Sequence, residues 1–185
     1  MPDDGGVSDQ QAGPGTRDVQ TVTASGASTV ASIDGVVTHR PATHADHRGL
    51  VYEIHNLAPA LGTEPVVWAY GDMVRPGQVK GWACHEEKVD RYTLVTGELL
   101  VLLHDGRADS PTSGLTQSVL LSPSATRQVR IPVGVWHLLV NVGAEPAHFV
   151  NLPTRPYHHA SPDRLLLPWD TDQLPVDVRS YLPRF

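Results

Sequence analysis

The chain has 185 residues, with 14 basic and 20 acidic side chains and a formal net charge of −6 at pH 7. This length suits one domain with a sizeable core, and the lack of a basic stripe argues against nucleic acid or an anionic membrane as a partner. The single cysteine, Cys84, excludes a disulfide framework; without a visible signal peptide or membrane span, we expect a cytoplasmic protein.

Residues 1–32 differ in composition from the rest of the chain. Gly, Ser, Thr, Asp and Gln dominate there, and large apolar residues form no run. Such a segment cannot bury enough surface to offset its ordering entropy, so we predict a disordered N-terminal arm. Residues 33–185 are expected to form one domain.

From Ile33 onward, short runs typical of β-strands alternate with turn residues, and Pro or Gly interrupts every candidate helix. Regular short strands with this punctuation predict an all-β sandwich or barrel. The tail from Pro153 is rich in Pro, Asp and Arg and is predicted to wrap the barrel irregularly. The predicted strands are residues 50–55, 66–70, 79–84, 89–96, 98–103, 118–122, 127–131, 136–142 and 147–152.

The segment GWACHEEKVDRYTLVTG, residues 81–97, carries the first group of candidate site residues. By the two-residue period of a strand, Ala83 and His85 share one face. After an intervening turn, Asp90 and Tyr92 share one face of the next strand. Histidine, aspartate and tyrosine in this pattern point to proton transfer or metal binding.

The segment PVGVWHLLVN, residues 132–141, carries the second group. Pro132 and Gly134 form a tight turn, and His137 opens the next strand. Together the two segments resemble the two motifs of the cupin superfamily, although Ala83 stands where the first motif has its first histidine. The resemblance implies a jelly-roll barrel, a double-stranded β-helix, with its site inside the barrel.

A metal site is one alternative for these residues. His85, Asp90 and His137 are a two-histidine, one-carboxylate set, which suits iron(II). The missing histidine leaves at most three ligands, and aspartate is shorter than the glutamate usual in this motif. We therefore expect no metal and no other cofactor.

Six segments in colinear order, from Ile33 to about Pro175, resemble the dTDP-4-dehydrorhamnose 3,5-epimerase family. This resemblance implies that the protein binds a small molecule, a nucleotide sugar, inside the barrel and forms a homodimer. The segments are DHRGLVYE (46–53), KGWACH (80–85), LVTGELLVLLHDGR (94–107), IPVGVWHLLVNV (131–142), NLPTRPY (151–157) and LPWDTDQLP (167–175).

The reaction implied by the resemblance removes a proton beside a ketone and returns it to the opposite face. It needs a base, an acid on the other side and a cation that holds the enolate. At the family's positions for base, acid and cation, this chain has Ala83, Asn151 and Asp90. Asp170 matches an aspartate that partners the base and is retained. Three replacements argue against the family's usual mechanism.

The binding positions implied by the resemblance are better kept. Arg48 and Glu53 match the segment that contacts the nucleotide, and Lys80 replaces an arginine that would meet the diphosphate. The structural alternatives are that Arg48 only stabilises a turn and that Lys80 is a solvated strand end. Trp82 and Trp136 either enclose the ligand at the pocket mouth or pack on the outer face, because their parity is opposite to that of the motif histidines.

Other polar residues offer substitutes for the lost groups. His85 is a candidate general base, which Asp90 either orients or replaces as base. His137 either donates a hydrogen bond to a substrate carbonyl or only pins its strand. Tyr92 and Tyr70 are candidate phenolic acids.

Three functions are consistent with these residues. We favour a metal-independent isomerase or cyclase that folds a small-molecule intermediate, as in a natural-product pathway, inside an epimerase-like barrel. The first alternative is a nucleotide-sugar epimerase or ketoisomerase, acting on a dTDP-4-keto-6-deoxy sugar, whose catalytic groups have moved. The second is a non-catalytic module that binds a sugar nucleotide or glycan. Fold alone does not choose among them.

Overall fold

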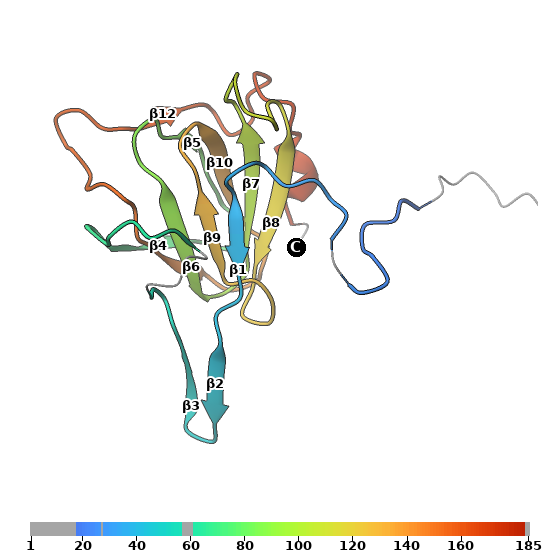
Figure 1. Ribbon diagram of the computed structural model, residues 1–185, viewed down its shortest axis with the longest axis vertical. Coiled ribbons are helices and arrows are strands. Elements are labelled where there is room, and N and C mark those ends of the chain that lie inside the picture. The colour runs from blue at the N-terminus through green and yellow to red at the C-terminus, as the bar shows by residue number, and fades with distance from the viewer. Residues whose placement is uncertain (1–17, 27, 57–60, 184–185) are drawn as a thin grey trace, which may run out of the picture. The chain divides into compact units, whose positions relative to one another are not determined.

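The computed structural model describes residues 18–26, 28–56 and 61–183 (Figure 1). The chain divides into two compact units, residues 1–31 and 32–185. In the first unit, an isolated bridge joins Val22 to Ser28 around a turn in which Gly26 has a φ of 83°. Residues 1–17 and 27 of the predicted disordered arm lie outside the described residues.

The second unit is an all-β jelly roll of two five-stranded antiparallel sheets, which confirms the predicted fold class (Figure 1). The first sheet runs β1 (Val37–His39), β9 (Gln128–Ile131), β6 (Asp90–Thr96), β11 (Ala147–Asn151) and β4 (Tyr70–Val74). The second runs β12 (Leu165–Leu166), β5 (Val79–Cys84), β10 (Val135–Asn141), β7 (Leu99–Asp105) and β8 (Thr116–Leu121).

The main core consists of the apolar side chains that both sheets turn inward, including Leu94, Val101, Ile131 and Phe149. Each such burial stabilises the fold by about 1.5–3 kcal/mol relative to an exposed side chain. Tyr92 also belongs to this core, and it lies on β6 two residues before Leu94. The strand pleat that builds the core thus also aims polar residues of β6 at the barrel interior.

A second apolar cluster includes Trp82 and Leu138, from neighbouring strands of the second sheet. Leu174 and Val178 of the C-terminal segment complete it. Val178 opens the 3₁₀ helix Val178–Tyr181, whose N-cap is Asp177. The predicted irregular C-terminal wrap is confirmed, because this segment covers the sheet with its apolar side chains.

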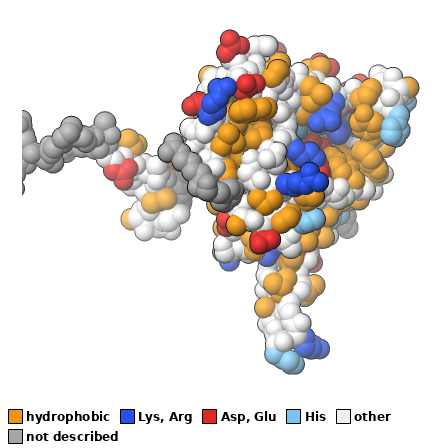
Figure 2. Space-filling view, turned by 180° about the vertical axis from the view of Figure 1, so that it is seen from behind, with side chains coloured by type: hydrophobic (Ala, Val, Ile, Leu, Met, Phe, Trp, Pro, Cys, Tyr) orange, Lys and Arg blue, Asp and Glu red, His pale blue; other side chains and the backbone are white. Residues whose placement is uncertain are grey.

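The hairpin of β2 (Thr43–Asp46) and β3 (Gly49–Tyr52) projects from the barrel (Figures 1 and 2). Its side chains are largely exposed, with Leu50 at 57% and Val51 at 64%. A two-stranded hairpin is marginally stable by itself, so exposed apolar residues here are unusual. In the described part of the chain, no helix has the length and apolar character needed to cross a membrane.

Candidate active site

A pocket of about 280 Å³ opens at the end of the barrel where β5 ends and β6 begins. Ala83 and His85 both line it, which confirms that they share a face. Asp90 and Tyr92 line it from the opposite sheet, as does Tyr70 of β4. The two sheets therefore present different polar groups to one cavity.

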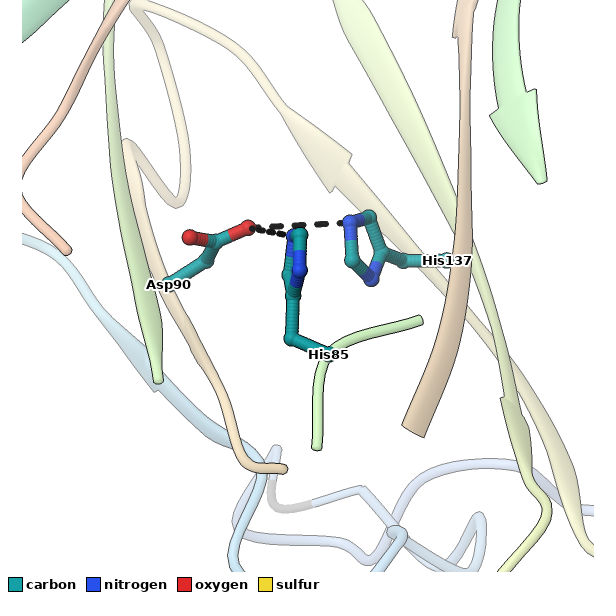
Figure 3. Close-up of side chains that lie close together, drawn as sticks. All are labelled: His85, Asp90 and His137. Atoms are coloured by element: carbon teal, nitrogen blue, oxygen red, sulfur yellow. Dashed lines mark ion pairs between the residues drawn. The ribbon is translucent and has the colours of Figure 1, made fainter. Parts of the chain in front are cut away.

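The centre of the pocket is a buried trio formed by Asp90, His85 and His137 (Figure 3). Asp90 Oδ2 lies 3.3 Å from His85 Nε2 and 3.6 Å from His137 Nε2. Antiparallel pairing of β10 with β5 sets His137 opposite Ala83. His85 follows Ala83 by two residues and therefore lies on the same side. Sheet register thus brings together side chains that are 52 residues apart in the two motifs.

Asp90 is an ionised carboxylate in this setting. Burial by itself would raise its pKa, but a hydrogen bond with His85 and electrostatic interactions with His137, His85 and Lys88 hold the pKa well below the usual range. Tyr92 Oη donates to Oδ2 at 3.0 Å, and Asn151 Nδ2 donates to Oδ1 at 2.9 Å. A carboxylate held in this way stabilises a cation beside it and is a poor proton donor.

Both histidines are held in one tautomer by backbone carbonyls. His85 Nδ1 meets the carbonyl of Asp163, and His137 Nδ1 lies 3.2 Å from the carbonyl of Val135. Because a carbonyl only accepts, each Nδ1 carries a hydrogen. Each Nε2 faces the Asp90 carboxylate and is the ring atom that can gain or lose a proton.

His137 contacts its own strand through Nδ1. Burial lowers its pKa to about 4, although Asp90 opposes the shift, so the ring is neutral at neutral pH. Its Nδ1 hydrogen points to the carbonyl of Val135. This contact fits the alternative role, pinning the strand, and a donor role toward a substrate stays a prediction.

The two candidate tyrosines have different partners. Tyr92 gives its hydrogen to Asp90, and burial together with that negative charge raises its pKa well above the usual value. Tyr70 accepts a hydrogen bond from Asn151 at 2.8 Å, which leaves its own hydrogen for a ligand. Burial and the Asp90 charge raise the pKa of Tyr70 to about 12, so it is protonated at neutral pH. Tyr70 is the better proton donor.

Lys88 is a site residue that sequence reasoning missed. It is 6% exposed, lines the pocket and places Nζ 3.8 Å from Asp90 Oδ1. In sequence it follows Glu86 and Glu87, so the segment reads as a solvated turn. Its position two residues before Asp90 was the sequence signal that could have predicted a place beside that carboxylate. The pocket therefore contains a buried cation beside Asp90.

The mouth of the pocket carries cationic and aromatic groups. Lys80 Nζ lies 2.7 Å from Asp72 Oδ2, and Arg164 also lines the pocket. Trp68 lines the pocket as well, with its ring 5.0 Å from that of Tyr70 and 6.1 Å from that of Tyr157. Trp68, Tyr157 and Arg164 were not among the predicted site residues. Trp68 was assigned to a predicted strand, whereas in the structure all three lie in irregular segments.

The two tryptophans predicted to contact the substrate lie elsewhere. Trp82 has no exposed surface and packs in the cluster beneath the C-terminal segment. Trp136 is partly buried and packs against the same cluster, next to Gly106. The prediction is corrected in favour of outer-face packing, which their strand parity had offered as the alternative.

Three further predicted residues lie apart from the pocket. Asp170 forms an exposed ion pair with Arg179 at 3.3 Å, so its predicted place beside a base is corrected. Arg48 pairs with Asp46 at 2.6 Å at the hairpin turn. The backbone carbonyl of Glu53 accepts from Gln128. A nucleotide-binding role for Arg48 and Glu53 stays a prediction.

A larger hollow of about 690 Å³ lies at the opposite end of the barrel, among the β6–β7, β8–β9 and β10–β11 turns. Its lining includes Glu98 and Glu145, whose charges disfavour an anionic ligand. The volume of a cavity alone therefore does not identify the active site. The smaller pocket holds the convergent titratable groups that mark functional sites.

The trio also has the composition of a metal site. Ligand atoms of His85, Asp90 and His137 all lie within 4.8 Å of one another, and their donor set suits iron or zinc. Lys88 already supplies a positive charge to the same carboxylate, which lessens the need for a metal ion. The absence of a metal stays a prediction.

Comparison with known proteins identifies the family. The dTDP-4-dehydrorhamnose 3,5-epimerase family matches residues 30–182. The chain belongs to this family. Agl13 of Haloferax volcanii, a probable low-salt glycan biosynthesis epimerase, is 30% identical over 135 residues, covering 69% of this chain and 82% of its own length. SpsL of Bacillus subtilis, a spore coat polysaccharide biosynthesis protein, is 31% identical over 146 residues, covering 77% of this chain and 93% of its own length.

Solved structures agree with this family assignment. A dTDP sugar isomerase from Desulfovibrio desulfuricans superposes with a TM-score of 0.72 at 27% identity, covering 78% of this chain and 91% of that protein. The predicted cupin-like barrel and the predicted resemblance to the sugar epimerases are both confirmed. Within this family, the polar groups of the pocket are candidates for epimerase chemistry.

Proposed function

We propose that the protein is a nucleotide-sugar epimerase that acts on a 4-keto sugar through catalytic groups moved from the family's usual positions. One observation carries the proposal: a histidine nitrogen that can exchange a proton and a protonated tyrosine reach one pocket from opposing sheets. Epimerisation needs a base and an acid on opposite faces of the sugar. This reading, an alternative at the sequence level, replaces the cyclase or natural-product isomerase that we favoured there, because the family and its relatives support a sugar epimerase.

His85 is the proposed base. Its Nε2 takes the proton from the carbon beside the ketone, while Nδ1 stays bonded to the Asp163 carbonyl. The imidazolium that forms lies 3.3 Å from the Asp90 carboxylate, which stabilises the new positive charge. Asp90 thus remains ionised and orients the base.

Lys88 is the proposed cation for the enolate. When the C–H bond breaks, its electron pair moves into the ketone and leaves negative charge on oxygen. An ammonium group in a buried pocket stabilises such a charge far better than one in water. Lys88 approaches from the loop that also carries His85, so one segment supplies both groups.

Tyr70 is the proposed acid. It gives its hydrogen to the opposite face of the enolate carbon and becomes a phenolate. Asn151 Nδ2 donates to the Tyr70 oxygen at 2.8 Å and stabilises that phenolate. Asn151 stands at the family's acid position, so the acid has moved to a neighbouring strand and the asparagine now supports it.

The mouth fits the rest of a nucleotide sugar. Lys80 and Arg164 offer positive charge to a diphosphate, and Trp68 and Tyr157 offer aromatic surface for a base. The small inner cavity suits the sugar ring. Relatives named for glycan and polysaccharide biosynthesis support a product destined for a glycan, and we retain the homodimer as the expected assembly.

Product analysis tests the proposal. Purified protein is incubated with dTDP-4-keto-6-deoxyglucose or its UDP analogue, the ketone is reduced with borohydride, and the sugars are identified by NMR. We expect an inverted centre beside the former ketone with the wild type and none with His85→Gln. Tight binding of an unchanged sugar would instead indicate a binding module; no binding and no product would indicate another substrate class.

A further inference from the structure

The loop from His85 to Val89 joins β5 to β6 and supplies both the proposed base and the proposed cation. Its ends are held by hydrogen bonds to residues outside the loop. Gly134 N donates to the carbonyl of His85 at 2.8 Å, and Val89 N donates to Thr154 Oγ1 at 3.0 Å. The middle of the loop offers three further backbone N–H groups, those of two exposed glutamates and of the buried Lys88.

Asp163 provides a partner for these groups through its side chain. Its carboxylate accepts from three consecutive backbone N–H groups, those of Glu86 at 2.8 Å, Glu87 at 3.1 Å and Lys88 at 3.0 Å. Successive N–H groups that converge on one anion form a compact, directional contact. The conformation of the loop is therefore fixed by a side chain about 75 residues away in sequence.

The backbone of Asp163 contacts the same loop. Its carbonyl accepts from His85 Nδ1, which keeps a hydrogen on that nitrogen. Pairing of Leu165 with Cys84 in β12 and β5 holds Asp163 beside the loop. One residue thus contacts the loop at four points, counting the ring of His85.

We propose that Asp163 is a positioning residue that sets the tautomer of His85 and the location of the Lys88 ammonium. This inference rests on the proposed function for the chemical roles of those two groups. Without the carboxylate, the three N–H groups turn to water and the loop relaxes. His85 then loses its fixed hydrogen bond, and Lys88 leaves Asp90. Misplacement of reacting groups by about 1 Å costs roughly 100-fold in rate.

The first test needs no substrate. Nitrogen-15 NMR spectra of the histidine rings are compared among the wild type, Asp163→Ala and Asp163→Asn. The His85 signals are assigned as those that disappear in His85→Gln. Asp172→Ala, which removes an exposed carboxylate from the same segment, is the matched control. We expect one tautomer, with hydrogen on Nδ1, in the wild type and control, and averaged tautomers in both Asp163 variants. An unchanged His85 spectrum in folded Asp163→Asn would overturn the proposal.

The second test uses steady-state kinetics on the keto sugar. We expect Asp163→Ala to lower kcat by about 100-fold with KM changed less than about threefold, and Asp163→Glu to recover part of the loss. A rise in KM with unchanged kcat would contradict a positioning role. If the wild type turns over no keto sugar while the His85 tautomer still depends on Asp163, the positioning inference stands and the proposed function fails.

Discussion

Two buried aspartates, Asp90 and Asp105, differ in where their hydrogen-bond partners come from and in whether those partners border a cavity. The side chain of Asp105 has no exposed surface, and that of Asp90 is 2% exposed. Asp105 accepts from Arg107 Nε at 2.7 Å and from the hydroxyls of Ser110 and Thr112, both at 2.6 Å. All these donors come from its own β7–β8 loop, so the carboxylate organises that loop and is saturated.

Asp90 takes its partners from its own strand β6, the β5–β6 loop, β10 and β11, and several of them line a cavity. His85, Lys88 and Tyr92 face the same pocket as Asp90. A network in which titratable groups border a cavity can move a proton to a ligand; a saturated local network cannot. Burial and a lowered pKa are common to both aspartates, so these properties alone do not identify a site.

The largest effect is expected for Asp90→Asn. The variant removes the negative charge that stabilises the His85 imidazolium and leaves the shape of the side chain. We expect kcat for keto-sugar epimerisation to fall by about 10³-fold, within the range for acid–base groups, with only a modest change in Tm. Asp105→Asn serves as the matched control and should keep the activity of each folded molecule. An unchanged rate would remove Asp90 from the mechanism.

The second effect is expected for Tyr70→Phe. Loss of the phenolic hydrogen should lower formation of the epimer by about 10²-fold, while proton removal by His85 continues. The ratio of solvent hydrogen exchange to epimer formation, measured by NMR, should therefore rise. Tyr92→Phe is the control of the same size, and a larger effect there than in Tyr70→Phe would reverse the assignment of the acid.

The third effect concerns stability at Asp105. Asp105→Asn replaces a charged acceptor of several hydrogen bonds with a neutral amide, and we expect the free energy of unfolding to fall by about 2–3 kcal/mol. Urea denaturation followed by fluorescence measures the loss. Asp172→Ala should stay within about 0.5 kcal/mol of the wild type, as expected for exposed positions. Equal stability of Asp105→Asn and wild type would show that the loop does not depend on this carboxylate.

The smallest effect is the pH dependence of that difference. Burial would raise the pKa of Asp105, but hydrogen bonds from Arg107, Ser110 and Thr112 lower it below its usual value. The carboxylate therefore stabilises the fold fully above the unfolded pKa of about 3.9, and this contribution is lost as pH falls below it. The Tm difference between wild type and Asp105→Asn should therefore shrink as the pH falls from about 6 to about 3, a range that spans the unfolded pKa. A constant difference would contradict the assignment.

Much of the barrel was predictable because local pattern and burial agree. The predicted strands at residues 79–84 and 136–142 fall on β5 and β10 to within one residue. β2, with the sequence THAD, was missed, since its exposed hairpin depends on backbone pairing and not on an apolar face. β4 begins at Tyr70, where the predicted strand at 66–70 ends. The polar segment Gly71–Asp72 has the sequence character of a turn, so the prediction ended the strand where β4 begins.

The site was predictable where strand parity positions it and unpredictable where loops do. The grouping of His85, Asp90 and His137 followed from two motifs and the period of a strand. Lys88 and Asp163 depend on how the β5–β6 loop meets the C-terminal segment, and no local pattern encodes that contact. Resemblance to the family predicted which catalytic groups are replaced and did not predict where the proposed substitutes lie.

Hydrogen exchange beside the ketone tests the central claim most directly. The wild type, Asp90→Asn and Asp105→Asn are each incubated with dTDP-4-keto-6-deoxyglucose in deuterated water, and the sugar protons are followed by NMR. The account predicts exchange with wild type and Asp105→Asn and a roughly 10³-fold slower rate with Asp90→Asn. Equal exchange with all three proteins, or none with the wild type, would contradict it.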